Sequence, residues 1–342
     1  MSAARQVRPA DWLVRLSEPV VAVSGSPDGT RWAILGTEGK AQVLDSGTGR
    51  VLVEWTAHAG GGFRLAWHPT QNLLATSGAD GRACLWDPAN GQLLHAFPGG
   101  SAWVEQLEWS PDGQFLAVGA GRILTLWTAT GVVVHTWKNH RSTLAALCWR
   151  HDSRKLAAAC YGGVTVYNPV SGQTDELLPW KTSLLSLAWS PDGRWVVAGT
   201  QDLSVQIWPQ PFKLGDELAM SGYPGKVREL VWHRGSRYLA TGGGEQVMVW
   251  DCGGDGPAGT EPRMLDGHTA RLTALAYQAN GHLLASAAAD GSLRFWNAKQ
   301  PQALCEVRLT GDVTALAWSR DDRAVLVGTQ DGTVAMVKAP AA

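Results

Sequence analysis

The chain has 342 residues, which is enough for two ordinary domains or one large all-β domain, and the 45% that are hydrophobic can form a substantial core. With 29 Lys and Arg against 30 Asp and Glu, the formal net charge is −1, so composition gives no electrostatic reason to expect nucleic acid or a membrane surface as the main partner. Gly and Trp are abundant, at 40 and 18 residues, which is typical of many short strands joined by tight turns.

The N-terminal sequence MSAARQVRPADWLVRLSEP contains no apolar run of the length that a signal peptide or a membrane span requires. The five cysteines are scattered and include no Cys-x-x-Cys pair, which argues against a disulfide framework and a structural zinc site. The nine histidines show no metal-ligand spacing either. We therefore expect a cytoplasmic chain with free thiols, no membrane contact, no metal and no cofactor.

An aromatic residue followed by a polar, turn-forming tetrad recurs along the chain. Seven copies are intact, and an eighth copy, GSPDG, lacks the aromatic residue. In chain order the anchors are Gly25, Trp67, Trp109, Trp149, Trp189, Trp232, Tyr277 and Trp318. Their spacings are 42, 42, 40, 40, 43, 45 and 41 residues, which indicates eight repeat units in register.

Each unit contains four short segments with strand character. Before the fifth anchor lies the alternating segment SLLSLAW, and after it come RWVVAGT and, past a tight turn, SVQIW. A less regular fourth segment, such as GQLLHAF, completes a unit. Period-2 alternation bounded by Gly, Asp and Pro predicts antiparallel strands, and four strands in every 40 to 45 residues predict a propeller blade.

The repeat resembles that of the WD40 family of β-propellers, over essentially the whole chain. The Trp-Asp dipeptide itself survives at Trp86-Asp87 and Trp250-Asp251 and is degraded elsewhere, for example to Trp127-Thr128. The resemblance implies an all-β, eight-bladed WD40-like propeller, with the family's commoner seven blades as the alternative.

The two ends of the chain predict how the ring closes. The last unit stops after its third strand, whereas a strand-like segment, DWLVRLSE, precedes the first unit. Because WD40 propellers often close this way, we expect residues 12–16 to complete the last blade and cover its open edge. The predicted organisation is one domain over 1–342, with a closing strand in 1–18 and blades at approximately 19–57, 58–99, 100–140, 141–181, 182–222, 223–267, 268–310 and 311–342.

Two units share a constellation that resembles a catalytic triad with an added Trp. In each, a His lies 22 residues before an Asp, a hydroxyl residue four before it, and a Trp six after it. The two sets are His58, Thr76, Asp80 and Trp86, and His268, Ser286, Asp290 and Trp296. In the WD40 family these positions form a hydrogen-bonded tetrad that satisfies buried polar groups. We interpret both sets as structural, because a catalytic His-Asp pair is expected once and neither hydroxyl lies in a Gly-x-Ser-x-Gly elbow.

The resemblance also implies a binding face, formed by the loops between units and the turns between the second and third strands. Counting from the anchors places aromatic, basic and polar side chains there. The candidate partner-binding residues are Trp103, Arg141, Tyr161, Trp180, Lys181, Gln201, Tyr223, Lys226 and Arg271. Aromatic residues and Arg are typical of interfaces, and the basic members suit an acidic segment. For each aromatic residue, packing under a neighbouring loop is the alternative.

Two long connections, 209–225 and 252–262, are either tolerated insertions or docking elements.

The hypothesis for function is a non-catalytic scaffold, monomeric on its own, that binds a protein or peptide partner on the tetrad-loop face. One alternative is an enzyme or small-ligand site in the central channel, which needs a convergent set of titratable residues that the sequence does not reveal. The other is an adaptor in a nucleic-acid-associated complex without direct nucleic-acid contact.

Overall fold

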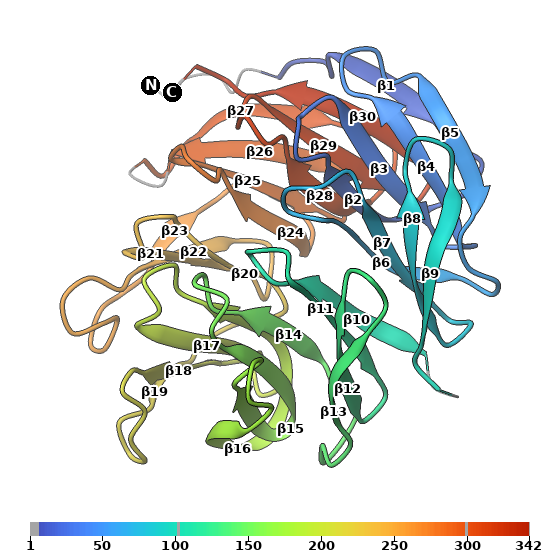
Figure 1. Cartoon of the computed structure of the whole chain (residues 1–342). Helices are drawn as coiled ribbons and strands as arrows, with labels where there is room; N and C mark the ends of the chain where they lie inside the picture. Colours follow the sequence, from blue (N-terminus) through green and yellow to red (C-terminus); the bar gives the residue numbers. More distant parts are fainter. Residues whose placement is uncertain (1–6, 101–102, 298–299, 342) are drawn as a thin grey trace, which may run out of the picture.

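The computed structural model describes residues 7–100, 103–297 and 300–341, and residues 1–6 of the predicted closing segment lie outside this part. The described chain consists of 30 β-strands arranged around a common centre (Figure 1). It contains no helix with the length and apolar character needed to cross a membrane.

The first three units each form a four-stranded antiparallel sheet. Their strands are β2 (Val20–Gly25), β3 (Arg31–Gly36), β4 (Lys40–Asp45) and β5 (Val51–Thr56); β6 (Gly62–Trp67), β7 (Leu74–Gly78), β8 (Arg82–Asp87) and β9 (Gln92–Pro98); and β10 (Val104–Trp109), β11 (Phe115–Ala120), β12 (Ile123–Thr128) and β13 (Val133–Trp137). In each unit the strand that ends at the anchor is the first strand of its sheet.

The fourth and fifth units share one sheet of six strands. Its strands are β14 (Ala146–Trp149), β15 (Leu156–Tyr167), β16 (Thr174–Trp189), β17 (Trp195–Thr200), β18 (Val205–Pro209) and β19 (Leu218–Met220). The sixth and seventh units are again four-stranded. They contain β20 (Leu230–Trp232), β21 (Tyr238–Thr241), β22 (Val247–Asp251) and β23 (Arg263–Leu265), and β24 (Leu272–Tyr277), β25 (Leu283–Ala288), β26 (Ser292–Asn297) and β27 (Ala303–Arg308).

The described chain therefore forms seven hydrogen-bonded sheets, so the prediction of eight separate blades is corrected to the seven of the alternative. The physical reason lies in β15 and β16, because each of these long strands pairs with one neighbour through its first part and with another neighbour through its second part. β15 pairs with β14 and β16, and β16 pairs with β15 through residues 174–183 and with β17 through residues 184–189. No loop interrupts β16 where the fourth unit passes into the fifth, so the hydrogen-bonded ladder continues across that boundary.

The eight repeat units nevertheless remain distinct in the ring. Each of the eight anchors is the last residue of the innermost strand of its unit, and these strands are β2, β6, β10, β14, β16, β20, β24 and β28 (Val313–Trp318). These inner strands contact one another in chain order, and β28 contacts β2 to close the circle. The seven sheets thus carry eight sequence units around one channel.

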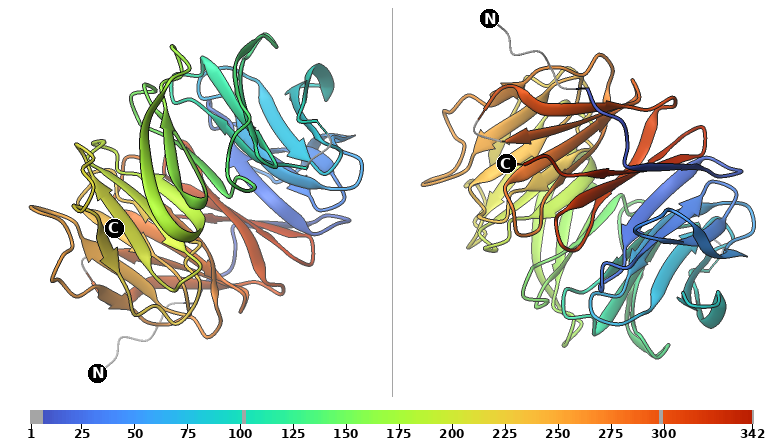
Figure 2. Two further views of the ribbon diagram at one scale, coloured as in Figure 1. Left: turned by 90° about the horizontal axis from the view of Figure 1, so that it is seen from below. Right: turned by 90° about the horizontal axis from the view of Figure 1, so that it is seen from above.

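The predicted closure by the N-terminal strand is confirmed. β1 (Trp12–Arg15) pairs antiparallel with β30 (Thr333–Lys338), outside β29 (Ala324–Thr329) and β28, and Figure 2 shows this segment running along the C-terminal strands. Trp12 lies opposite Met336, and Arg15 lies opposite Thr333. At the start of the strand, the Asp11 carboxylate accepts a hydrogen bond from the Lys338 amide at 2.7 Å. The last sheet therefore depends on residues from both ends of the chain.

We expect Val14→Asp to open this closure. The Val14 side chain packs on the core cluster beneath β30, so a carboxylate there is desolvated without a partner and should lower the free energy of unfolding by about 2–4 kcal/mol. Urea denaturation measures the change. Leu13→Asp is the matched control because Leu13 is exposed on the other face of β1, and its effect should stay within about 0.5 kcal/mol. Equal effects of the two substitutions would contradict the claim that packing of the Val14 side chain on the core stabilises the closure by β1.

Candidate functional site

The second unit contains a complete chain of four hydrogen-bonded side chains. His58 Nδ1 donates to Asp80 Oδ1 at 2.9 Å. Trp86 Nε1 donates to Thr76 Oγ1 at 2.8 Å, and the Thr76 hydroxyl donates to His58 Nε2 at 2.8 Å. Because Thr76 is fully buried and bonded on both sides, its hydroxyl has no path to a substrate.

The seventh unit has the same chain with an additional member. Trp296 Nε1 donates to Ser286 Oγ at 2.7 Å, and Ser286 Oγ lies 2.6 Å from His268 Nε2. Asp290 does not bond the imidazole directly, because its Oδ1 lies 3.7 Å from His268 Nδ1. Ser292 Oγ bridges them, at 2.7 Å from the imidazole and 2.5 Å from the carboxylate. The expected Asp290–His268 bond is thus replaced by a relay through Ser292, a residue that the spacing pattern did not reveal.

The protonation states of this relay suit a structural role. Burial lowers the pKa of His268 to about 4, assisted by the positive charge of Arg294. Burial raises the pKa of Asp290, but hydrogen bonds from Ser292 and Thr269 outweigh this effect and hold the pKa well below its usual range. At neutral pH the imidazole is therefore uncharged and the carboxylate ionised, with both groups enclosed by hydrogen-bond partners.

Tyr223, predicted as a partner-binding residue, is instead buried, with 3% of its surface exposed. It stands nine residues before its anchor, where His58 and His268 stand before theirs. Trp250 Nε1 donates to the Tyr223 hydroxyl at 2.8 Å, and that hydroxyl lies 2.9 Å from Thr241 Oγ1. Tyr223 therefore takes the place of the tetrad histidine, and its partner-binding role is withdrawn.

Trp180 stands at the same position of the fifth unit and is half-buried. Its ring packs against the core cluster of the fourth and fifth units, and Lys181 Nζ lies 5.8 Å from the ring centroid. Trp180 is therefore better described as a side chain packed against its neighbours than as an exposed partner-binding residue. Lys181 itself stays exposed.

A hollow of about 510 Å³ opens on the tetrad-loop face at the entrance to the central channel, and we call it the channel mouth. Its lining includes Phe63, Arg64, Glu105, Thr143, Tyr161, Gln201 and Arg228. Trp103 joins it through Phe63, because the two ring centroids lie 5.7 Å apart at an interplanar angle of 43°. The structure thus brings together three of the predicted residues, Trp103, Tyr161 and Gln201.

The other predicted partner-binding residues are more dispersed. Arg271 lines the channel below the mouth, and Arg141 lines a separate pocket beside it. Lys226 is exposed but lines neither hollow. Three further residues of the mouth, Phe63, Glu105 and Arg228, are absent from the predicted set, and all three stand four residues before their anchors.

The channel itself contains the convergent set of titratable residues that the sequence did not reveal. A cavity of about 710 Å³ is lined by Arg64, Glu108, Arg228, Glu229, Arg271 and Asp312. Burial raises the pKa of Glu108 to about 8 and raises that of Glu229, whereas it lowers that of Arg64. These residues come from inner strands and loops of different units, so only the closed ring brings them together.

The two long connections are held against the propeller. In 209–225, Phe212 lies 6.4 Å from Trp189 between ring centroids, and Met220 is buried. In 252–262, the Gly254 carbonyl accepts a hydrogen bond from Arg194 Nη2 at 2.9 Å. Among the described residues, no group of three His, Cys, Asp or Glu side chains is placed to hold a metal ion.

The architecture defines a class of protein: a ring of antiparallel β-sheet repeats, closed by its own N-terminal strand and locked by buried tetrads. The chain belongs to the WD40 family. The family model "WD domain, G-beta repeat" matches residues 49–87, 91–128, 177–209, 217–251, 259–297 and 304–336, more than half of the chain.

Several named proteins are similar to the chain over part of their length. It is 24% identical over 242 residues to WD repeat-containing protein 26 homolog of Arabidopsis thaliana, which covers 68% of this chain and 40% of that protein. It is 26% identical over 250 residues to the B-type cell cycle switch protein ccs52A of Medicago truncatula, covering 68% and 50%. It is 25% identical over 292 residues to "Cell division cycle 20.1, cofactor of APC complex" of Arabidopsis thaliana, covering 82% and 54%. The chain thus spans less than two thirds of each of these relatives.

Among solved structures, the crystal structure of the computationally designed Ika8 protein matches with a TM-score of 0.83 and 23% identity. It covers 98% of this chain and all of the designed chain. At this level of identity the likeness concerns the fold alone.

We expect the tetrad of the seventh unit to make stability depend on pH. His268 has a folded-state pKa near 4 and an unfolded value near 6.5, so the unfolded state takes up the proton first as the pH falls. The stabilisation is complete above about pH 6.5 and declines towards pH 4. The difference in unfolding free energy between wild type and His268→Asn should therefore shrink by up to about 3 kcal/mol between pH 7 and pH 4, measured by urea denaturation. His151→Asn is the control because His151 is exposed. Its unfolding free energy should stay within about 0.5 kcal/mol of the wild-type value from pH 7 to pH 4.

We expect Tyr223→Phe to destabilise the sixth unit by about 1–3 kcal/mol, because it leaves the buried Trp250 N–H without an acceptor. Thermal and urea denaturation measure the loss, and the Trp250 indole proton resonance should shift. Tyr238→Phe in the same unit is the control, since the Tyr238 hydroxyl has no hydrogen bond within the described chain. If Tyr223→Phe leaves the free energy of unfolding unchanged, Tyr223 does not take the stabilising place of the tetrad histidine.

Proposed function

We propose that this propeller is a non-catalytic scaffold that binds a peptide segment of a protein partner at the channel mouth. The observation that carries the proposal is the pair of aromatic rings Phe63 and Trp103 at the rim of the mouth, with Tyr161 also in its lining. Trp103 is 59% exposed and Tyr161 51% exposed, although large aromatic side chains are usually covered. Exposed aromatic residues beside a hollow are typical of binding surfaces.

The charges of the mouth favour a partner segment with acidic side chains. Arg64 and Arg228 line the hollow, and Glu105 is the one carboxylate in its described lining. A guanidinium group pairs well with a carboxylate when the surroundings exclude part of the water. The WD40 family membership and the name of one relative, a cofactor of the APC complex, are consistent with a scaffold role in an assembly.

The alternative of a small-ligand or enzymatic site in the channel draws support from the six charged residues that line its cavity. We favour the peptide because the exposed aromatic rings lie at the mouth and not within that cavity. Cytoplasmic location and a monomeric state remain part of the proposal.

A phage-displayed library of random peptides, selected on the immobilised wild-type protein, tests the proposal. We expect enriched peptides that bind with measurable affinity in fluorescence polarisation. Trp103→Ala should weaken the binding at least about tenfold, equivalent to about 1.4 kcal/mol, because it removes an exposed aromatic contact.

The matched control is Leu214→Ala, which truncates another exposed apolar side chain, in the connection between β18 and β19. Its effect on affinity should be less than twofold. The proposal fails if the library yields no enriched peptide, or if Trp103→Ala and Phe63→Ala both leave the affinity unchanged.

A further inference from the structure

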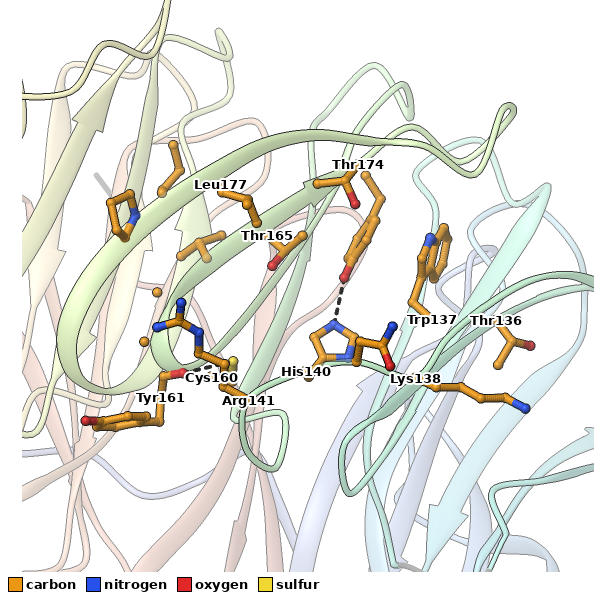
Figure 3. A pocket seen from close by; sticks show the side chains of 17 residues that line it. Thr136, Trp137, Lys138, His140, Arg141, Cys160, Tyr161, Thr165, Thr174 and Leu177 are labelled. Atoms are coloured by element: carbon orange, nitrogen blue, oxygen red, sulfur yellow. Dashed lines mark hydrogen bonds between the residues drawn. The ribbon is translucent and has the colours of Figure 1, made fainter.

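A third hollow, of about 770 Å³, lies between the third and fourth units, and we call it the side pocket. One wall is the connection 138–141 that follows β13, and the other walls come from β15 and the first half of β16 (Figure 3). Tyr161 lines both the side pocket and the channel mouth. The two hollows therefore share a wall residue.

The side pocket lies where the fourth unit departs from the repeat. Thirteen residues after its anchor, where Asp80 and Asp290 stand in their units, this unit has Gly162. The Tyr167 hydroxyl lies 2.9 Å from His140 Nε2 (Figure 3). The Nδ1–H of His140 donates to the Arg122 carbonyl at 2.9 Å. The tetrad carboxylate is thus absent from this turn, and no Asp or Glu is present in the described lining of the pocket.

Arg141 brings a positive charge into this pocket without a counter-ion. In Figure 3 its guanidinium group points into the space enclosed by β15 and β16, whereas the Lys138 amine points away from it. Among the described residues, Arg141 has neither a hydrogen bond nor an ion pair. The lack of a side chain at Gly162 makes this placement possible, because a Cβ there would lie 2.8 Å from Arg141 Cδ.

Apolar side chains line another part of the same pocket. Leu177 is 70% exposed, Pro179 is also exposed, and Trp137 is half-buried and stacked on Tyr167 with ring centroids 4.4 Å apart. Exposed apolar groups beside an unpaired guanidinium group suit a ligand that combines an apolar surface with a negative charge.

We propose that the side pocket binds an acidic side chain, Asp or Glu, that stands next to a large apolar residue in a partner peptide. The carboxylate pairs with the Arg141 guanidinium group, and the apolar neighbour packs on Leu177 and Pro179. This inference rests on the proposed function, since the same peptide continues past Tyr161 into the channel mouth.

Comparative selection of the phage-displayed library on wild type and on Arg141→Met tests the inference. The displayed peptides are fused to the coat protein through their C-terminus, so a carboxylate must come from a side chain. We expect peptides enriched on wild type alone to carry Asp or Glu beside Leu, Ile, Phe, Met or Trp. Arg141→Met should weaken their binding at least tenfold in fluorescence polarisation, and replacing the peptide's acidic residue by its amide should do the same.

A double-mutant cycle identifies the pair directly. Arg141→Met combined with the amide peptide should bind no more weakly than either single change, because both remove one interaction. Lys138→Met is the matched control: it removes a positive charge from the same connection but should change the affinity less than twofold. Melting temperatures and the Trp137 indole resonance verify that each variant is folded.

The outcomes separate this inference from the proposed function. If Arg141→Met and the amide peptide leave the affinity unchanged while Trp103→Ala weakens it, the side-pocket inference is wrong and the channel mouth stands. If Arg141→Met abolishes binding while Trp103→Ala and Phe63→Ala do not affect it, the side pocket is a binding site and the channel mouth fails. Equal losses with Lys138→Met and Arg141→Met would overturn the specific pairing, since they would reflect general charge attraction.

Discussion

Contact between each unit and its neighbours is the constraint on which the ring depends, and at the anchors Trp67, Trp149 and Trp318 this contact includes an indole hydrogen bond to the preceding unit. The Trp67 indole donates to the Ser24 carbonyl at 3.1 Å, and the Trp318 indole donates to the Ala276 carbonyl at 2.9 Å. In both cases the acceptor is the residue just before the previous anchor. A single four-stranded unit cannot bury both of its faces, so each unit acquires its core only from its neighbours. The pairing of β1 with β30 matters for the same reason, because it completes the last sheet of the circle.

Within the units, the requirement at the tetrad positions is that buried polar groups find partners, and the chemistry that achieves this varies. His58 bonds Asp80 directly, whereas His268 reaches Asp290 through Ser292. In the sixth unit a tyrosine, Tyr223, replaces the histidine and accepts the indole proton itself, whereas a Thr or Ser hydroxyl accepts it in the other two units. An unpaired buried donor costs more than a hydrogen bond of a different type, which explains why the indole keeps an acceptor in these three units although the residues change. The third unit differs, because its Trp127 indole N–H is buried without a partner in the described chain.

The departures from the repeat gather on the face that carries the proposed function. The fourth unit lacks the tetrad carboxylate, merges with the fifth unit through β16, and contributes both Tyr161 and Arg141 to open hollows. An irregular unit leaves an unpaired guanidinium group and exposed apolar side chains, which is the chemistry that we assign to peptide binding.

The sequence by itself determined the repeat, the all-β propeller and the closing strand, because these depend on local alternation and on a spacing that recurs along the chain. It also located the His, hydroxyl and Trp positions of two tetrads. Only the tertiary structure decided that β15 and β16 join two units into one sheet, since the continuity of a hydrogen-bonded ladder depends on loop geometry. It also decided that Tyr223 faces inward and that Arg64, Glu108 and Arg271 meet in one channel. Those outcomes arise from contacts between residues far apart in the chain, which no local pattern encodes.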